Sequence, residues 1–356
     1  MTAPVALFFG TRPQVIKASV LRDALSAVGP VLAVDTGQHY DYAMHQVHYD
    51  QLSVQPPDAF LNVGTGSHAE QTAAILTACE AWLDAHPVRC AVVIGDTNTT
   101  MACALAATKH RVPVAHVEAG LRSADHLMAE EINRRVVDAV AHWLFAPCAR
   151  VAAVLRKERP EAMVMDTGDV AYDVLRRALP LAPPPESVPG YNVDWDGQFV
   201  YCTLHRAELV NVPARLAPVI AALNRSPFPV LLSAHPRTAA ALERVGLRPG
   251  AHVRCGGPVG YLESLSLTQR AAVVVTDSGG LQREAYWLGR PCVTVRDETE
   301  WVETVERGAN RLVPPEAAAR LPGEIAAAFS GGVTWDRGAY GDGSAAGCIA
   351  AALTSR

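Results

Sequence analysis

Short apolar runs alternate with stretches of helical periodicity along most of the chain. The runs are almost continuously hydrophobic, which is typical of parallel strands that are buried on both faces. Helices are expected between them. In the first half the predicted strands are Val5–Phe9, Val31–Asp35, Cys90–Gly95, Val114–Val117, Trp143–Ala146 and Met163–Met165.

The second half repeats this rhythm. Its predicted strands are Phe199–Thr203, Pro229–Ser233, Val253–Cys255, Ala272–Thr276 and Pro291–Val295. Between the halves, residues 179–197 are rich in proline and glycine, which interrupt regular elements and mark a linker or an excursion. The pattern predicts an α/β protein with two Rossmann-like, doubly wound domains that face a cleft.

The length and composition of the chain agree with a soluble enzyme. The 356 residues exceed the usual size of one core, and the net charge of −5 gives no electrostatic footprint for nucleic acid. The eight cysteines form no CxxC pair, which argues against a zinc site or a disulfide framework. The first residues lack the features of a signal peptide, and no window reaches transmembrane length. We therefore expect a cytoplasmic protein without nucleic-acid or membrane partners.

Four acidic residues that are candidates for catalysis lie in one segment of forty residues. Asp96 follows the apolar run CAVVIG and Glu118 follows VPVAHV, so both are expected at carboxyl ends of buried strands, where ligand crevices lie. Glu130 and Glu131 open an amphipathic helix, and Arg134 lies one turn further on. Carboxylates in one crevice indicate proton transfer, because burial and like charge can raise the pKa of one acid while another stays ionised.

These acids also have structural interpretations. Asp96 could cap the following helix, since Asp is a favoured cap. Glu130 and Glu131 could be first-turn acids that face the helix dipole. Glu118 has no local capping role before AGLR, and an unpaired glutamate is rarely buried. Glu118 is therefore the strongest functional candidate of the four.

The second half contains a strand-to-helix turn suited to phosphate. In VVVTDSGGLQREA, the residues Ser278, Gly279 and Gly280 place free backbone N–H groups at a positive helix end. Glu284 falls within the first turns of that helix, where it can accept hydrogen bonds from ribose hydroxyls. Glycine-rich turns also arise from packing alone, so the motif by itself does not decide between the two interpretations.

Basic and imidazole groups follow several predicted strands. Arg12 and Lys17 lie just beyond the first strand, where they can reach an anionic ligand or simply begin a solvated helix. His205 ends the strand FVYCTL, and His235 with Arg237 ends PVLLSA. A single histidine at such a position is usually structural, but two in the same half favour a site.

Several long motifs in one order resemble the bacterial non-hydrolysing UDP-N-acetylglucosamine 2-epimerase family. The resemblance extends from Val5 to about Val313. The motifs that carry it are GTRPQVIK, TGQHYD, GDTNTT, HVEAGLRS, EEINR, TLHRAE, AHPRT and DSGGLQREA…LGRPCVTVRDETE.

The resemblance implies the two-domain fold shared with one large class of nucleotide-sugar glycosyltransferases, termed GT-B. It also implies an active site between the domains and a C-terminal helix that packs back onto the first domain. The stretch Ala345–Leu353 fits that helix. We expect an N-terminal domain of residues 1–168, joined by the C-terminal helix 343–356, and a UDP-binding domain of residues 169–342.

The implied reaction interconverts UDP-GlcNAc and UDP-ManNAc. The C2 proton is not adjacent to a ring carbonyl, so its direct removal would leave a prohibitive carbanion. No GxGxxG follows the first strand, so oxidation by a nicotinamide is not indicated and no cofactor is expected. The remaining route expels UDP as the proton leaves, forms a 2-acetamidoglucal with a C1–C2 double bond, and returns UDP with a proton on the opposite face.

The resemblance also distributes roles over the residues named above. The expected catalytic residues are Asp96, Glu118, Glu130 and His205. The expected substrate-binding residues are Arg12, Lys17, Arg134, His235, Arg237, Ser278, Gly279, Gly280 and Glu284. No metal ligand is expected. Which carboxylate removes the proton and which returns it stays open.

The chain departs from the family pattern at four positions. Gln14 stands where Glu is common, Ala129 where proline often precedes the paired glutamates, and Leu209 where many members have Asn. Trp301, in TEWVETVE, replaces the arginine of the commoner TERPE. This last form resembles a branch that includes epimerases for 2,3-diacetamido uronic acid sugar nucleotides.

Two expectations depend on these departures. The carboxylate of a uronic acid substrate would pair with Arg206, Arg237 or Arg296. A regulatory second sugar-nucleotide site would involve the TGQH region, but the nearby segment GTGSHAEQT differs from the form that regulated members usually show. Allostery is therefore left open.

The leading expectation is a non-hydrolysing 2-epimerase of UDP-GlcNAc. The alternatives are a 2-epimerase for a 2,3-diacetamido uronic acid UDP-sugar and a hydrolysing enzyme that releases N-acetylmannosamine and UDP. A glycosyltransferase or a binding module would not need three acids at strand ends and a helix start. We expect a homodimer that acts in cell-surface polysaccharide biosynthesis.

Overall fold

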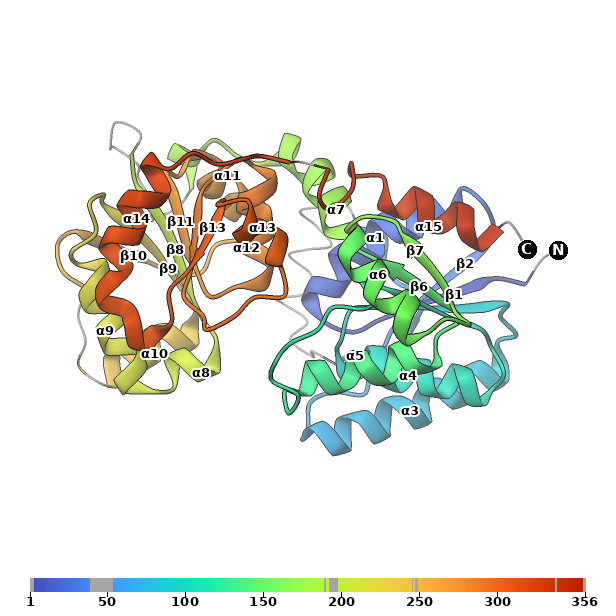
Figure 1. The fold of residues 1–356 in the computed structure, drawn as a ribbon. Coiled ribbons are helices and arrows are strands. Elements are labelled where there is room, and N and C mark those ends of the chain that lie inside the picture. The colour runs from blue at the N-terminus through green and yellow to red at the C-terminus, as the bar shows by residue number, and fades with distance from the viewer. Residues whose placement is uncertain are drawn as a thin grey trace. The chain divides into compact units, whose positions relative to one another are not determined.

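The computed structural model describes residues 3–38, 54–188, 190–191, 198–244, 246, 249–336 and 338–354. The chain forms two compact units. The N-terminal unit comprises Met1–Arg177 with Gly338–Arg356, and the C-terminal unit comprises Ala178–Arg337. Each unit contains one parallel sheet with helices on both faces (Figure 1). The predicted α/β class with two doubly wound sheets is therefore confirmed.

The N-terminal sheet has seven strands in the order β3-β2-β1-β4-β5-β6-β7. Because β1 pairs with both β2 and β4, the winding reverses there, and the carboxyl ends of β1 and β4 border the switch point. The strands are β1 (Val5–Phe9), β2 (Val31–Asp35), β3 (Ala59–Phe60), β4 (Cys90–Ile94), β5 (Val114–Val117), β6 (Trp143–Ala146) and β7 (Met163–Asp166).

Helices cover both faces of this sheet. α3, α4 and α5 lie side by side on one face, whereas α1 and α15 pack together on the other (Figure 1). The helices of the unit are α1 (Arg12–Ser26), α3 (His68–Ala85), α4 (Asn98–Lys109), α5 (Ala129–Val140), α6 (Ala149–Glu158), α7 (Val170–Ala178) and α15 (Ala345–Thr354).

The C-terminal sheet has six strands in the order β10-β9-β8-β11-β12-β13. Its winding reverses at β8, which pairs with β9 and β11, so the carboxyl ends of β8 and β11 border a second switch point. The strands are β8 (Val200–Leu204), β9 (Val230–Ala234), β10 (Val253–Gly256), β11 (Val273–Thr276), β12 (Cys292–Thr294) and β13 (Asn310–Leu312).

The helices of the C-terminal unit form two layers. α9 and α14 pack together against one face of the sheet, and α11 and α12 pack together on the other. The α-helices are α8 (Ala207–Val210), α9 (Pro213–Leu223), α10 (Pro236–Arg244), α11 (Tyr261–Arg270), α12 (Gly279–Trp287), α13 (Val302–Glu306) and α14 (Leu321–Ser330). The 3-10 helices are η1 (Leu179–Leu181), η2 (Pro185–Ser187) and η3 (Pro315–Arg320).

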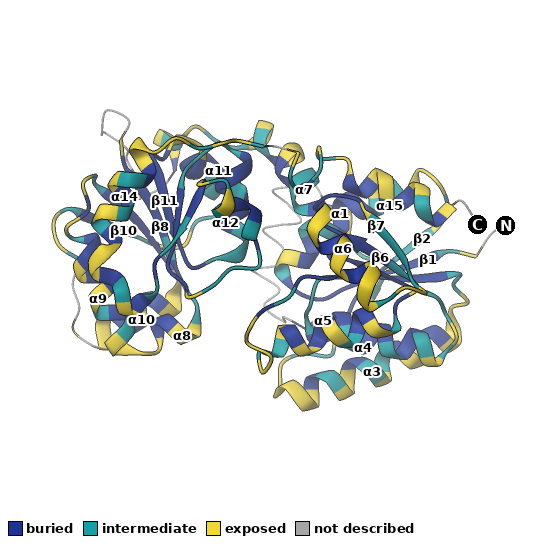
Figure 2. Cartoon of the chain, viewed as in Figure 1, coloured by how far each residue is buried: buried dark blue, intermediate teal, exposed yellow. Residues whose placement is uncertain are grey.

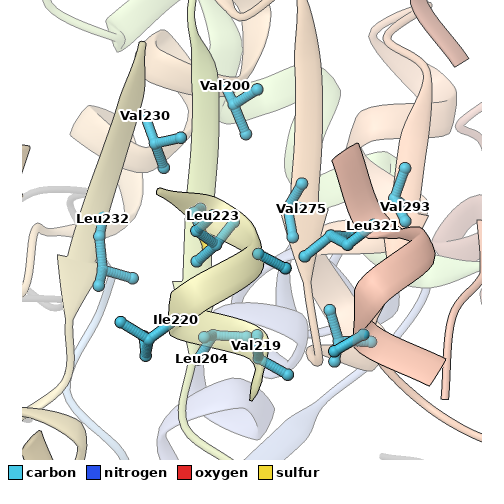
Figure 3. Close-up of a cluster of buried hydrophobic side chains, with 14 of the residues drawn as sticks. Val200, Leu204, Val219, Ile220, Leu223, Val230, Leu232, Val275, Val293 and Leu321 are labelled. Carbon is cyan, nitrogen blue, oxygen red and sulfur yellow. The ribbon is translucent and has the colours of Figure 1, made fainter. Parts of the chain in front are cut away.

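Figure 3 shows how the larger core cluster of the C-terminal unit is built. Val219, Ile220 and Leu223 of α9 point towards valines and leucines of the sheet, and Leu321 of α14 closes the cluster. The central strands of both units are buried, whereas the outer faces of α3 and α6 are exposed (Figure 2). Among the residues described, none of the helices combines the length and hydrophobicity that a membrane span needs.

Two strands were missed by the hydrophobic pattern. β3 has only two residues, Ala59–Phe60, and β13 reads Asn310–Leu312, with a polar and a charged residue among its three. Both are edge strands, so each pairs on one side only and is not required to be apolar on both faces. The remaining strands lie within one or two residues of their predicted bounds.

The proline-rich segment 179–197 begins as part of the C-terminal unit. Residues 179–188 contain η1 and η2, and both contact α11. Val188 and Tyr191 are buried in the core cluster with Phe199 and Leu231. The segment is thus an excursion that packs on its own sheet, at least as far as the described residues show; residues 189 and 192–197 lie outside them.

Hydrogen bonds join the start of α7 to the segment that leads into α15 and to α15 itself. The N–H of Asp169 donates to the carbonyl of Tyr340 (2.9 Å), and a Cβ on Gly168 would lie 2.8 Å from the same oxygen. Asp173 caps α15 by accepting from the N–H groups of Ala345 (3.1 Å) and Ala346 (2.9 Å). These contacts place α7 and residues 338–342 in the N-terminal unit, whereas the expected boundaries assigned them to the other domain.

Candidate active site

Gln14 connects the two loops at the N-terminal switch point. Its side-chain Oε1 accepts from the N–H groups of Gly10 (3.0 Å) and Thr11 (3.1 Å), after β1. Its Nε2 donates to the carbonyl of Ile94 (2.7 Å), at the end of β4. An amide suits this position because it donates and accepts at once. The departure from Glu at position 14 is therefore compatible with a fully bonded side chain.

Asp96 lies in the loop after β4 and forms an ion pair with Arg134 of α5. Its side chain is 30 % exposed, whereas that of Arg134 is 5 % exposed. The helix that follows is capped by Thr97, whose hydroxyl accepts from the N–H of Thr100. Capping therefore does not account for Asp96, which is held by Arg134 as a partly accessible carboxylate.

Glu118 directly follows β5 and has a left-handed backbone conformation, with φ of 63°. Such a conformation is uncommon for a residue other than glycine, and its cost is of order 1–3 kcal/mol. Its carboxylate forms an ion pair with Lys17 of α1 at 2.6 Å. A Cβ on Gly95 would lie 3.3 Å from its Oε2, so Glu118 lies beside the residue that precedes Asp96.

The paired glutamates of α5 have different environments. Glu131 is fully buried and accepts from the N–H of Ser123 (2.9 Å), from Arg134 (3.2 Å) and from Arg135 (2.6 Å). Glu130 is exposed at the start of the same helix. Glu131 thus has the structural role that the sequence left open for both, and Glu130 remains accessible.

The basic residues at this switch point differ in whether they have an acidic partner. Lys17 forms an ion pair with Glu118, and Arg134 bridges Asp96 and Glu131. Arg12 is partly buried and makes no hydrogen bond or ion pair with any residue that the structure describes. Burial lowers the pKa of its guanidinium. Arg12 is therefore a charged group suited to an anionic ligand.

The C-terminal switch point is organised by Asp277. This fully buried carboxylate follows β11 and accepts from the backbone N–H groups of His205 (2.8 Å) and Arg206 (2.8 Å), which follow β8. The Nδ1 of His205 lies 3.0 Å from Oδ1 of Asp277. Within the described part of the chain, this Oδ1 accepts no hydrogen bond. The ring of His205 is 43 % exposed.

α12 begins beside this pair. Ser278 is its N-cap, and the hydroxyl accepts from the N–H of Leu281 (3.3 Å). Gly279 and Gly280 occupy the first helical positions, whose N–H groups have no partner within a helix. A Cβ on Gly280 would meet nothing closer than 3.7 Å, so packing does not require glycine there. Glu284 follows in the next turn and is partly buried.

His235 and Arg237 follow β9 and are exposed. The Nδ1 of His235 accepts from the N–H of Arg237 (3.2 Å), and the ring centroids of His205 and His235 are 6.4 Å apart. The side chain of Arg237 forms no ion pair with a described residue. Both residues therefore belong to the same strand-end cluster as His205.

Trp301 packs beside the start of α12. Its ring is 5 % exposed, and the guanidinium of Arg283 lies 3.9 Å from its centroid, within cation–π range. A Cβ on Gly279 would lie 3.7 Å from its Nε1. The two nearby arginines expected to meet a uronic acid are paired otherwise: Arg296 with Glu300, and Arg206 with Glu208.

A model of the UDP-N-acetylglucosamine 2-epimerase family matches residues 29–354. The chain belongs to this family. It is 43 % identical to UDP-2,3-diacetamido-2,3-dideoxy-D-glucuronate 2-epimerase of Pseudomonas aeruginosa, with 97 % of the chain and 98 % of that protein covered. UDP-N-acetylglucosamine 2-epimerase of Methanocaldococcus jannaschii is 38 % identical, with 87 % and 88 % covered.

Solved structures of the family agree with the fold. The M. jannaschii epimerase in complex with UDP-GlcNAc and UDP matches with a TM-score of 0.87 and 34 % identity, covering 99 % of this chain and 100 % of that one. The Neisseria meningitidis epimerase bound to UDP-GlcNAc matches with a TM-score of 0.86 and 26 % identity, with the same coverage. The epimerase assignment from sequence motifs is therefore confirmed at the level of the family.

In this epimerase the expected residues form two groups. Asp96, Glu118, Glu130, Lys17, Arg12 and Arg134 gather at the N-terminal switch point, and His205, His235, Arg237, Ser278, Gly279, Gly280 and Glu284 gather at the C-terminal one. Sequence reasoning missed Asp277 and His116. Both are polar residues at or near the end of a buried strand, which is the signal that identified Asp96 and Glu118.

The TGQH region, where a regulatory site was left open, lies only partly within the described residues. In the TGQH motif, Thr36 and Gln38 are buried, and Gln38 accepts from the N–H of Thr99 (2.9 Å), whereas residues 39–53 lie outside the described part of the chain. Within that described part, no group of three or more His, Cys, Asp or Glu side chains is arranged to hold a metal ion.

Proposed function

We propose that this protein inverts C2 of a UDP-linked 2-acetamido sugar by eliminating UDP and adding it back. The observation that carries the proposal is the pair of carboxylates at one switch point: Asp96 follows β4, and Glu118 lies beside Gly95. Each is held by a cation, Arg134 or Lys17, at an end of a buried strand. Inversion requires proton transfer on both faces of C2, and two carboxylates supply it.

The bond changes balance without a redox partner. A base removes the C2 proton, the C–H electrons form the C1–C2 double bond, and the C1–O bond breaks to release UDP. A second acid then protonates C2 from the opposite face as a diphosphate oxygen re-forms the bond to C1. We assign these proton transfers to Asp96, Glu118 and Glu130, of which Glu130 is the exposed member.

The departing diphosphate needs positive charge and hydrogen-bond donors. Arg12 and His205 supply the side chains, and the N–H groups of Gly279 and Gly280 supply backbone donors at the start of α12. Glu284 is assigned to the ribose. Lys17 and Arg134 were expected to contact phosphate, and each already faces a carboxylate, so we assign them first to holding Glu118 and Asp96.

We propose a 2,3-diacetamido glucuronate as the preferred sugar, with UDP-GlcNAc as the alternative. The relative that is 43 % identical over nearly the whole chain carries that substrate in its name. Arg237 is the remaining arginine of the three considered for the sugar carboxylate, because Arg206 and Arg296 already pair with glutamates. A guanidinium and a carboxylate form a strong, charge-assisted hydrogen bond.

Exchange of the C2 proton with solvent tests the mechanism. The protein is incubated in heavy water with each UDP-sugar, without added metal or nicotinamide, and C2 is followed by NMR. The expected result is deuterium at C2 of both epimers. Epimerisation without solvent exchange into the product would contradict elimination. Free N-acetylmannosamine with UDP as products would instead identify a hydrolysing enzyme.

The ratio of kcat/KM for the two UDP-sugars tests the substrate. A preference for the diacetamido glucuronate by more than about tenfold is expected, because one unmatched charged group changes discrimination strongly. A preference for UDP-GlcNAc would reject the uronate and leave the mechanism standing. We further propose that the protein is a cytoplasmic homodimer whose product enters cell-surface polysaccharide synthesis. The molar mass of the protein in solution, measured by light scattering, tests the dimer.

A further inference from the structure

We propose that His116 is a buried imidazolium that positions the two carboxylate-bearing loops at the N-terminal switch point. The inference rests on the proposed epimerase function only for its kinetic readout. His116 lies in β5, two residues before Glu118, and is fully buried. It contacts no part of the expected ligand site directly, so its role is to hold other residues in place.

Both ring nitrogens of His116 face acceptors. Nδ1 lies 2.7 Å from Oδ1 of Asp138 in α5, and Nε2 lies 2.7 Å from the carbonyl oxygen of Gly95. A backbone carbonyl can only accept, so Nε2 must carry a proton. A neutral imidazole would then point the lone pair of Nδ1 at a carboxylate. Two N–H groups satisfy both contacts, and the geometry therefore requires the protonated ring.

Asp138 is arranged as an anion. Its other oxygen, Oδ2, accepts from the N–H of Gly120 (3.1 Å) and from Arg122 (2.7 Å). Burial acts to raise the pKa of Asp138, but the hydrogen bonds and charges of His116 and Arg122 outweigh it, so the pKa is lowered. The lowered pKa of Asp138 and its ion pair with Arg122 favour this anion over a neutral pair in which Asp138 carries the proton on Oδ1.

The charged surroundings are consistent with this pair. Arg122, in the loop after β5, also binds Glu158 of α6, so the network continues towards the surface. From the β6 side, His142 accepts from the N–H of Val114 (3.3 Å). From the β4 side, the neutral carbonyl of Gly95 faces the ring. The charges thus alternate in sign from the buried His116 and Asp138 to Arg122 and the exposed Glu158.

The pair fixes both active-site loops. The N–H of Gly95 donates to the carbonyl of Val117 (2.9 Å), and its carbonyl accepts from His116, so the peptide before Asp96 is held on both sides by β5. Asp138 also holds Gly120, two residues after Glu118. His116 and Asp138 therefore bracket the segment that carries Glu118 while they hold the turn that carries Asp96.

Small displacements of these acids would be costly, since a misplacement of about 1 Å can reduce the rate about a hundredfold. We expect His116→Gln and Asp138→Asn each to lower kcat by roughly tenfold to a hundredfold. UDP affinity should change little.

A matched control separates positioning from stability. Val114→Ala removes a fully buried side chain from the same strand without touching the pair. It should lower the melting temperature and leave kcat per folded site unchanged. If His116→Gln and Val114→Ala gave the same kcat at comparable loss of stability, the positioning role would be overturned.

The ring itself gives a readout that needs neither a variant nor a substrate. In the ¹⁵N NMR spectrum of histidine-labelled wild-type protein, both nitrogens of His116 should show the shift of protonated imidazolium at neutral pH. One protonated and one bare nitrogen would overturn the inference. If no UDP-sugar were turned over at all, the proposed function would fail while this measurement still decided the state of His116.

Discussion

The two switch points of this protein share a topology and differ in chemistry. In each unit the winding of a parallel sheet reverses at its first strand, β1 or β8, and the expected site residues follow the strands on either side. The N-terminal point gathers ion pairs, Lys17 with Glu118 and Arg134 with Asp96. The C-terminal point offers a glycine-rich helix start and one buried carboxylate, Asp277.

The difference shows what topology does and does not determine. Strand order determines where a ligand can lie, because loops diverge at the switch point and leave a crevice. The residues at the strand ends determine what happens there. Carboxylates held by cations suit proton transfer, whereas free N–H groups of a helix start suit binding of a diphosphate. We therefore propose that the N-terminal unit performs the chemistry and that the C-terminal unit binds UDP.

Removing the carboxylates should have the largest effect. Asp96→Asn, Glu118→Gln and Glu130→Gln should each lower kcat by about two to four powers of ten, the range of lost acid or base catalysis. UDP affinity, measured by calorimetry, should be retained. Glu161→Gln, at a carboxylate that is 64 % exposed, serves as the control and should leave kcat unchanged. Near-normal turnover of Glu118→Gln would break the division between the two units.

A methyl group at the start of α12 should have the converse effect. Gly280→Ala has room in the protein, since the nearest atom to the new Cβ is 3.7 Å away. Helix propensity favours alanine by up to about 1 kcal/mol. The substitution should nevertheless weaken UDP binding by roughly tenfold to a hundredfold, the equivalent of one charge-assisted hydrogen bond. Glu284→Ala should weaken UDP binding as well.

Gly347→Ala is the control for Gly280→Ala. Gly347 lies in α15, and a Cβ there would meet nothing within 4 Å. The control should change stability in the same direction and leave the affinity for UDP as it is. An unchanged UDP affinity in Gly280→Ala would contradict the proposal that the diphosphate binds at the start of α12.

Arg237→Gln should separate the two candidate sugars. If Arg237 binds the sugar carboxylate, kcat/KM for the diacetamido glucuronate should fall about tenfold, the equivalent of roughly 1.4 kcal/mol, with little change for UDP-GlcNAc. Arg244→Gln, at the other end of α10, is the matched control. An equal loss for both sugars would assign Arg237 to the shared UDP moiety instead.

Gln14→Glu should have the smallest effect and should act on stability. A carboxylate at position 14 would accept from Gly10 and Thr11 but would face the carbonyl of Ile94. We expect a loss of about 1 kcal/mol in the free energy of unfolding at neutral pH. Since the strain arises from the ionised form, it should disappear as pH falls below the carboxyl pKa. Denaturant unfolding at two pH values checks this, and a loss independent of pH would contradict it.

Much of the fold follows from the sequence because its strands are buried on both faces. The runs that became β1, β2, β5 and β6 were predicted with their observed bounds. The strands β3 and β13 could not be predicted, since β3 has only two residues and β13 contains Asn310 and Arg311, so neither forms a continuous apolar run. The proline-rich segment shows a related limit, because composition indicates an interruption but not the surface on which it packs.

The site was predictable only in part. Strand ends mark Asp96, Glu118 and His205, but their partners lie far away in the sequence. Lys17 is 101 residues from Glu118, and His205 is 72 residues from Asp277. Such pairs depend on strand register and helix placement, which no local pattern encodes. The same reason explains why Glu130 and Glu131 could not be distinguished until the helix placed one of them in the interior.

The contact between α7 and α15 has a consequence for the order of folding during translation. The C-terminal unit is contiguous, whereas the N-terminal unit needs a helix that the ribosome makes only after the whole C-terminal unit. Until α15 emerges, Asp173 has no N–H groups to cap, and the surface of α1 that α15 covers stays open. The N-terminal unit, although synthesised first, is therefore completed last. Nascent chains that end before residue 345 should bind chaperones through that open surface.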